Sequence, residues 1–513
     1  MRGQPVGFLV ACALCFALLY AAARAWWAVW WRPRSLERQL RRQGIPGTTY
    51  RLLLGDVQEY VGAMADACSK PIPLGHRIPP RADPFMHRVA ERYGKMSFAW
   101  MGTTPRLMVR DTELVKDIYS HKDDCIQKPP LNPLIKLLAR GLSILEGETW
   151  ALRRKLITPA FHVDKLKGMV PAFFSSCEQL IGRWEKLVGS EGSSCELDVW
   201  PEFQRLTGDV ISKTAFGSSY EEGKRIFQLQ QEQGVLVMEA ARAVYIPGSR
   251  FIPTPKNRRR MYLDHQIKSM LRDLIRMKEA AMEKGGSDTD DLLGLLLQSA
   301  RYGHRGAITV EDVIEECKLF YFAGHETTSV WLTWAMVALS MHQDWQQRAR
   351  EEVLQACGSN PPDIQTMNQL RIVSMVLNEV LRLYPPVIAV HRHTIQEVKL
   401  GGKSIPAGVD MVLPTLLIHH DPDIWGDDAE EFNPERFSQG ISKAGKDQNA
   451  FFPFGWGPRI CLGQSFAMME AKMALSMILQ RFSFELSPSY AHAPYAVVTL
   501  QPQYGAQLIL RKI

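Results

Sequence analysis

One cysteine in this chain has the surroundings of an open-faced metal ligand. Cys461 lies in a glycine-rich loop, Phe454–Gly463, with Arg459 two residues before it and a predicted helix starting near Leu462. The positive end of a helix dipole and its free N–H groups favour a thiolate, and glycines let the backbone approach a flat ligand closely. The alternative is a buried structural cysteine in a tight turn, which is the commoner role of a lone cysteine.

The overall composition is that of an ordinary globular protein. The chain has 513 residues, of which 46% are hydrophobic and 22% charged, and its net charge is +7. This charge is mild, and the sequence has no basic stripe interleaved with aromatic residues, so we expect no nucleic-acid partner. The nine cysteines are scattered and form no disulfide framework, which indicates a reducing compartment for the folded part.

The N-terminus predicts a membrane anchor. Val6–Ala23 is almost uninterrupted apolar sequence, about the length that spans a bilayer core. Tryptophans between residues 26 and 31 follow as an interfacial belt, and arginines between residues 32 and 42 favour a cytoplasmic body. A cleaved signal peptide is the alternative, but the tryptophans stand where a small-residue cleavage site would be expected. We therefore predict an anchor over residues 1–31, a basic and Pro/Gly-rich hinge over residues 32–49, and one domain over residues 50–513.

Helical patterns dominate the body, and strand patterns are short. One hairpin is predicted over residues 97–110, with its turn at residues 102–105, and another over residues 398–405, with its turn at Gly401-Gly402. Residues 497–510 have strand character with a polar break. These patterns predict a mainly α domain with a small β part.

The longest predicted helix, from a Thr309 cap to about His342, has an unusual middle. Apolar sequence surrounds the run Gly324-His325-Glu326-Thr327-Thr328. Glycine costs about 1 kcal/mol against alanine in a helix interior, and a buried, unpaired carboxylate costs several kcal/mol more. Such local violations mark functional sites, although a polar turn on the surface of an amphipathic helix is the alternative.

Together these two segments resemble the cytochrome P-450 superfamily, the haem-thiolate monooxygenases. The pattern Phe-x-x-Gly-x-Arg-x-Cys-x-Gly resembles their haem-binding loop, and Ala323–Thr328 resembles the oxygen-binding segment of their long central helix. The resemblance implies the cytochrome P-450 fold, and haem b (iron protoporphyrin IX) with Cys461 as the axial iron ligand. It also implies catalytic roles for Glu326 and Thr327, because a carboxylate–hydroxyl pair can relay the protons that splitting dioxygen requires.

Further motifs of this family occur in the expected order along the chain. Glu379 and Arg382, with Arg436 in Pro434–Phe437, resemble a buried charge cluster whose role is structural rather than catalytic. The resemblance also implies that the arginines near the cofactor bind the haem propionates, as cations bind carboxylates. The cofactor contacts implied beside Cys461 are Trp150, Arg154, Arg392, Phe454 and Arg459.

The substrate pocket is predicted by family analogy. Its candidate walls are mostly apolar, which suggests an apolar substrate, although plain core packing would give the same pattern. They are Phe320, Ala323, Val387, Val390, Val497 and the loop over residues 131–145.

Several shorter segments resemble one plant clan of the family. They are Gly44–Gly47, Tyr50-Arg51, Asp423–Gly426 and Phe452–Gly457. The clan they resemble includes secologanin synthase and acts on terpenoids, steroids, hormones and fatty acids.

The resemblance implies a monooxygenase, anchored in the endoplasmic reticulum membrane, that hydroxylates an apolar small molecule with dioxygen. Electrons would come from a separate NADPH-dependent cytochrome P-450 reductase, because the chain has no Gly-x-Gly-x-x-Gly or flavin segment. Two alternatives stay open: a reductase-independent enzyme of the same fold that rearranges peroxides, and a non-catalytic haem sensor or carrier. A hydrolase or metalloprotease has little support, since neither Gly-x-Ser-x-Gly nor His-Glu-x-x-His occurs.

Overall fold

Helices account for 62% of the chain and strands for 11%, which confirms the predicted mainly α fold with a small β part. The computed structural model describes residues 4–121, 125–138, 140–190, 193–218, 220–245, 248–284, 291–302 and 308–513. Its buried core follows the long helices in the middle of the body and extends to the sheets.

The helices and strands of the described residues have the following bounds. The helices, with short 3-10 or π segments marked η, are α1 (Gln4–Trp26), η1 (Trp27–Trp31), α2 (Arg32–Arg42), α3 (Val57–Cys68), α4 (Pro79–Ala82), α5 (Pro84–Tyr93), α6 (Thr112–Ser120), η2 (Ile135–Leu137), η3 (Gly141–Ser143), α7 (Gly147–Ile157), η4 (Thr158–Phe161), α8 (Val163–Val188), α9 (Val199–Phe216), α10 (Tyr220–Ala241), η5 (Ser249–Phe251), α11 (Pro255–Glu283), α12 (Leu292–Tyr302), α13 (Val310–Met341), α14 (Gln343–Cys357), α15 (Ile364–Gln369), α16 (Arg371–Leu383), α17 (Thr415–His419), α18 (Pro422–Trp425), η6 (Pro434–Phe437), η7 (Ile441–Lys443), η8 (Gly457–Arg459) and α19 (Gln464–Arg481). The strands are β1 (Met96–Met101), β2 (Thr104–Val109), β3 (Ile126–Gln127), β4 (Ser194–Asp198), β5 (Val390–Thr394), β6 (Val398–Leu400), β7 (Lys403–Ile405), β8 (Asp410–Leu413), β9 (Phe482–Leu486), β10 (Pro494–Ala496), β11 (Leu500–Pro502) and β12 (Gln507–Lys512).

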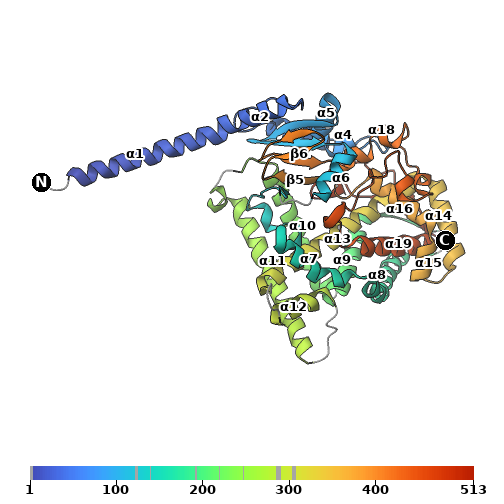
Figure 1. Ribbon diagram of the computed structural model, residues 1–513. Helices are drawn as coiled ribbons and strands as arrows, with labels where there is room; N and C mark the ends of the chain where they lie inside the picture. The colour runs from blue at the N-terminus through green and yellow to red at the C-terminus, as the bar shows by residue number, and fades with distance from the viewer. Residues whose placement is uncertain are drawn as a thin grey trace.

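The central helix α13 forms as the sequence predicts. Thr309 caps it, and Thr309 and Asp312 make the reciprocal bonds of a capping box. Most of its residues are buried, because it passes through the middle of the body, where it packs against α9, α16 and α19 (Figure 1). Its length and burial make it the element on which other parts of the site are positioned.

The strands form small sheets beside the helices. The largest has the order β1-β2-β8-β5-β3, in which β1 and β2 are the predicted N-terminal hairpin and β8 runs parallel to β2. The predicted hairpin β6–β7 has the expected turn at Gly401-Gly402, both with positive φ. The strand-like C-terminal stretch divides into β11 and β12, and β12 pairs with β4 and β9. This arrangement fixes β5, which carries Arg392, at the inner part of the sheet.

The N-terminal helix α1 projects away from the body (Figure 1). Among the described residues, one helix is long and apolar enough to cross a membrane; it spans Gly7–Arg42, with a mean hydropathy of 2.0 in its most apolar window. The later part of this stretch packs on the body, since Leu36 and Leu40 of α2 are buried. Ile45 is also buried, and a Cβ added to Gly47 would lie 2.3 Å from the carbonyl oxygen of Phe98. Residues of the predicted hinge therefore contribute to the packed core.

Candidate active site

The loop that carries Cys461 is closed by its own backbone. The N–H of Cys461 donates to the carbonyl of Phe454 at 2.8 Å, and Gly455 and Gly457 have φ values of +76° and +67°, which favour glycine. A Cβ on Gly457 would lie 2.9 Å from the carbonyl oxygen of Tyr119. The loop thus needs glycine for both backbone shape and close packing.

The helix after Cys461 starts slightly later than predicted. α19 begins at Gln464 with Gly463 as its N-cap, instead of near Leu462, because Leu462 and Gly463 still belong to a turn. Burial raises the pKa of the Cys461 thiol, while the N–H of Gly463 and the positive charge of Arg154 oppose this rise. These two groups are the local features that favour a thiolate.

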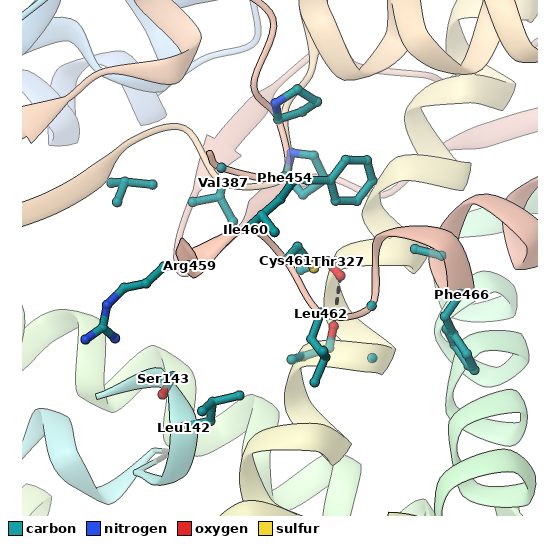
Figure 2. A pocket seen from close by; sticks show the side chains of 18 of the residues that line it. Leu142, Ser143, Thr327, Val387, Phe454, Arg459, Ile460, Cys461, Leu462 and Phe466 are labelled. Atoms are coloured by element: carbon teal, nitrogen blue, oxygen red, sulfur yellow. Dashed lines mark hydrogen bonds between the residues drawn. The ribbon is translucent and has the colours of Figure 1, made fainter. Parts of the chain in front are cut away.

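Cys461 lines a cavity of about 380 Å³; its side chain is surrounded by the body of the protein but faces the open space of this cavity. Figure 2 shows Cys461 and Thr327 within this cavity. Four of the predicted pocket residues line it, namely Phe320, Ala323, Val387 and Val390, together with Leu142 and Ser143 of the predicted loop.

Val497 is the exception among the predicted pocket residues. It is not among the described residues that line the cavity. The turn between β10 and β11 directs its neighbours elsewhere: Val498 lies 3.7 Å from the position of a Cβ on Gly234 of α10, and Thr499 bonds Glu326. No described residue of β10, β11 or the turn between them lines the cavity.

The middle of α13 contributes Thr327 and Gly324 to the cavity. The Thr327 hydroxyl donates to the carbonyl of Ala323 at 2.8 Å, the bond dashed in Figure 2. A Cβ on Gly324 would lie 2.7 Å from Cδ1 of Ile211 on α9. The glycine is therefore required where α9 and α13 cross, which is a packing reason that the sequence did not reveal.

Glu326 does not reach the cavity together with Thr327. Its carboxylate accepts a hydrogen bond from Thr499 Oγ1 at 2.8 Å and another from Gln501, and it is absent from the described residues of the cavity wall. Burial raises the pKa of Glu326, and these two hydrogen bonds oppose the rise. In this structure the predicted carboxylate–hydroxyl pair is separated, because β10–β11 holds the carboxylate.

The predicted cofactor contacts gather at the cavity. Three of them are cationic, and the cavity is lined by Arg154, Arg392, Arg459 and Trp150. The Arg459 guanidinium lies 4.3 Å from the ring centroid of Trp150. Arg154 donates to the carbonyl of Ile460 at 2.9 Å, and Arg459 donates to the carbonyl of Leu145 at 3.0 Å. The cysteine loop and the loop before α7 are thereby joined through arginines.

Lys128 is a further cation at the same place, and the sequence analysis missed it. It lines the cavity, and burial, with the charges of Arg459 and Arg392, lowers the pKa of Lys128 to about 7. Lys128 follows the short strand β3 and belongs to no recognised motif. Only the pairing of β3 with β5, which sequence patterns do not predict, could have indicated its position beside Arg392.

The cationic residues fit a dianionic cofactor such as haem. Burial lowers the pKa of Arg459, and repulsion from Arg392 and Arg154 adds to this effect, while Glu146 opposes it. The hydroxyl of Tyr119, which also lines the cavity, is buried without a hydrogen-bond partner among the described residues. Clustered cations and an unpaired hydroxyl are the groups that carboxylates of a bound ligand would satisfy.

The predicted charge cluster is assembled away from the cavity. Arg382 binds both carboxylate oxygens of Glu379 at 2.7 Å, and both side chains are fully buried. Arg436 Nε lies 3.6 Å from Glu379. Arg382 also donates to the carbonyls of His419, Ala429 and Glu431. The cluster therefore joins α16 to the irregular segment that follows α18.

The fold and this site define a class of protein: a mainly α protein with a cysteine loop facing a cavity that is bordered by cations. Comparison with known proteins gives the family. The family model for cytochrome P450 matches residues 79–508, and the chain belongs to the cytochrome P450 family of monooxygenases. Members of this family bind haem and use dioxygen, a substrate and a redox partner.

Similar proteins occur in several plants. Cytochrome P450 CYP72A616 of Paris polyphylla is 56% identical over 97% of this chain and 98% of its own length. Cytochrome P450 CYP72A219 of Panax ginseng is 52% identical, with 98% of each chain covered. Cytochrome P450 72A15 of Arabidopsis thaliana is 50% identical over 96% of this chain and 97% of its own length. The predicted membership of the superfamily is confirmed.

Proposed function

We propose that this protein is a membrane-anchored monooxygenase that hydroxylates an apolar small molecule of the terpenoid, steroid, hormone or fatty-acid classes. The observation that carries the proposal is that Cys461 and Thr327 line one largely apolar cavity bordered by cations. The apolar walls favour an apolar ligand, and the redox partner is an NADPH-dependent cytochrome P450 reductase.

The proposed cofactor is haem b; Cys461 would bind its iron, and Trp150, Phe454 and the surrounding cations would hold the rest of the group. Arg154, Arg392, Arg459 and the additional residue Lys128 would bind its propionates, since clustered cations stabilise carboxylates. When bound, the haem supplies the activation of dioxygen for insertion of one oxygen atom into a C–H bond. The glycines of the cysteine loop keep the backbone close enough for this packing.

The chain's own contribution to catalysis is proton management. Thr327 offers a hydroxyl inside the cavity, and its bond to the Ala323 carbonyl leaves its oxygen free to accept another hydrogen bond. Glu326 acts as the proton source only when its carboxylate leaves Thr499 and Gln501. Burial raises the pKa of Glu326, which favours the protonated carboxyl needed for donation. Glu379, Arg382 and Arg436 keep a structural role.

We further propose a single-pass anchor in the endoplasmic reticulum membrane with the body on the cytoplasmic side. The apolar helix near the N-terminus and the arginines that follow it support this orientation. In isolated microsomes, a tag at the C-terminus is expected to be digested by added protease without detergent. A tag that is protected until detergent is added would contradict this orientation.

Reconstitution with reductase tests the proposed reaction. Substrate classes are first screened by spectral titration of the full-length protein in lipid nanodiscs. Product is then expected only when NADPH, reductase and dioxygen are all present. Product from a fatty-acid hydroperoxide without reductase would identify a peroxide-rearranging enzyme instead. Haem binding without turnover of any class would favour a sensor or carrier.

A further inference from the structure

Two oppositely charged residues, Glu316 and Lys318, are fully buried on α13 although neither lines the cavity among the described residues. Burying an ion is unfavourable unless it is paired and hydrogen-bonded. Each of these ions has a partner of opposite charge, and each also binds one backbone group of the same loop. This loop consists of residues 131–138 and 140–145, and we call it the wall loop.

Glu316 binds the part of the wall loop that is nearest the cavity. Its Oε2 accepts a hydrogen bond from the N–H of Leu142 at 3.0 Å, and its Oε1 pairs with Arg153 of α7 at 2.8 Å. A Cβ on Gly141 would lie 2.5 Å from the same Oε2, and Gly141 has a φ of +53°. The loop therefore approaches this carboxylate as closely as only a glycine allows.

Lys318 binds an earlier turn of the wall loop. Its Nζ donates to the carbonyl of Leu137 at 2.9 Å and pairs with Asp264 of α11 at 2.6 Å. Residues two apart on a helix point to different sides, so the two ions hold the loop at two separate places. Leu137 also packs with Leu134 and Ala240 in a small apolar cluster.

The backbone N–H that Glu316 binds belongs to a residue of the cavity wall. Leu142, whose N–H binds Glu316, lines the cavity together with Ser143 (Figure 2). We propose that Glu316 and Lys318 are positioning residues that fix the wall loop and thereby determine the size of molecule that the cavity accepts. The inference rests on the proposed function only in taking this cavity as the substrate site.

Amide hydrogen exchange and ligand size selectivity test the inference in the full-length, haem-loaded protein. In Glu316→Ala and Lys318→Met, amides of residues 137–138 and 140–145 are expected to exchange about tenfold faster, because a hydrogen bond to a charged group is lost. The ratio of Kd values for a biphenyl-substituted imidazole and for imidazole is expected to change by about tenfold, with the Kd for imidazole itself nearly unchanged.

The matched control is Glu311→Gln, on the same helix. Glu311 pairs with Lys268 at 3.0 Å and with Arg272 at 3.1 Å, both on α11, so its loss is expected to change neither wall-loop exchange nor the Kd ratio. Because Lys268 also pairs with Asp264, the partner of Lys318, this variant is the control for Glu316→Ala. If both α13 variants fail to fold, Gly141→Ala tests the same contact from the loop. Where Glu316→Ala does fold, the effect of Gly141→Ala is expected to be smaller in the double variant with Glu316→Ala, because the carboxylate that the added Cβ would meet is then absent.

The outcomes separate this inference from the proposed function. Unchanged wall-loop exchange and an unchanged Kd ratio in the folded variants would overturn the inference, as would additive effects in the double variant. If the wild-type protein shows no imidazole spectrum, the proposed function fails, while hydrogen exchange still decides whether Glu316 and Lys318 hold the loop. A uniform loss of thermal stability without a selectivity change would show that the ions are merely structural.

Discussion

At the residue scale, the site combines a thiol, a hydroxyl and several cations around one cavity. Cys461 is oriented by the bond from its own N–H to Phe454, and Arg154, Arg392, Arg459 and Lys128 place positive charge nearby. Thr327 supplies one of the hydroxyls that line the cavity, whereas the carboxylate of its neighbour Glu326 is held by Thr499. The residue whose role is most open to test by substitution is therefore Thr327.

Replacing Thr327 by alanine is expected to uncouple NADPH oxidation from product formation. Without its hydroxyl, proton delivery fails and reduced oxygen escapes as peroxide, so product formation falls by on the order of 100-fold or more while NADPH oxidation continues. Product and peroxide are measured together in the reconstituted system. Thr333→Ala is the matched control, because Thr333 also bonds a carbonyl one turn earlier, that of Ser329, but does not line the cavity in the described structure. Fully coupled turnover in Thr327→Ala would contradict the proposed role.

At the element scale, the site depends on how closely α13 meets its neighbours. α9 crosses α13 at Gly324, where Ile211 occupies the space of a Cβ. The wall loop is bound to α13 through Glu316 and Lys318, and β10–β11 is bound through Glu326. One helix thus positions three separate parts of the chain.

A methyl group at Gly324 is expected to destabilise the protein. Overpacking against Ile211 costs about 1–3 kcal/mol, which exceeds the gain of about 1 kcal/mol that alanine brings to a helix interior. Thermal unfolding of Gly324→Ala measures the difference, and the loss in the double variant with Ile211→Ala is expected to be smaller than the sum of the two single losses, because the side chain that the methyl group meets is then shortened. Gly168→Ala is the control, since a Cβ there meets nothing within 4 Å. Equal stabilisation by both glycine substitutions would contradict the close crossing.

The positions of helices and strands were more predictable from the sequence than the directions in which their side chains point. The capping box at Thr309 and the hairpin at Gly401-Gly402 follow from local residue chemistry, so their positions could be predicted. Lys128 and Tyr119 reach the cavity only through long-range packing, which leaves no local pattern in the chain. Glu326 lies on α13, which lines the cavity, but its side chain binds Thr499 instead; Val497 lies in the turn between β10 and β11, which does not line the cavity among the described residues. Both side-chain directions depend on long-range contacts.

At the scale of the whole molecule, a projecting apolar helix is joined to a body whose packing starts before residue 50. Leu36, Leu40 and Ile45 are part of the same core as the central helices. The hydroxyl of Tyr50 donates to the carbonyl of Val29, so the N-terminal helical segment and the body meet at a defined place. The region between them is consequently a packed junction with its own contribution to stability.

Two truncations are expected to separate anchoring from folding. Removing residues 2–31 should release the protein from membranes with little change in Tm, because it removes mainly exposed apolar residues. Removing residues 2–43 also deletes Leu36 and Leu40, and burial of such side chains is worth about 1.5–3 kcal/mol each, so Tm should fall. Thermal unfolding and membrane sedimentation measure both effects. Equal Tm values for the two truncations would contradict the packed junction.

Stability is also expected to fall in mild acid. Burial lowers the pKa of His325 and His492 to about 4 and, with the charge of Arg382, that of His419 and His420 to about 3. In the unfolded chain these histidines bind protons near pH 6.5. Their contribution to the free energy of unfolding is therefore complete above that pH and decreases progressively toward pH 3. Denaturant titrations between pH 7.5 and pH 4 are expected to show this decrease, and His325→Phe should make it smaller. Burial raises the pKa of Asp83 to about 6, which opposes this decrease, so the decisive quantity is the difference between wild type and His325→Phe. An identical pH dependence of the two proteins would contradict the prediction.

The most direct test of the account is the spectrum of the reduced, carbon-monoxide-bound protein in which Cys461 is replaced. Cys461→Ala is expected to lose the thiolate-type absorption band, and Cys461→His to bind haem with a nitrogen-ligated spectrum instead. Cys195→Ala, which removes a half-buried thiol on β4, is expected to keep the wild-type band. An unchanged thiolate-type band in Cys461→Ala would contradict the assignment of Cys461 as the iron ligand.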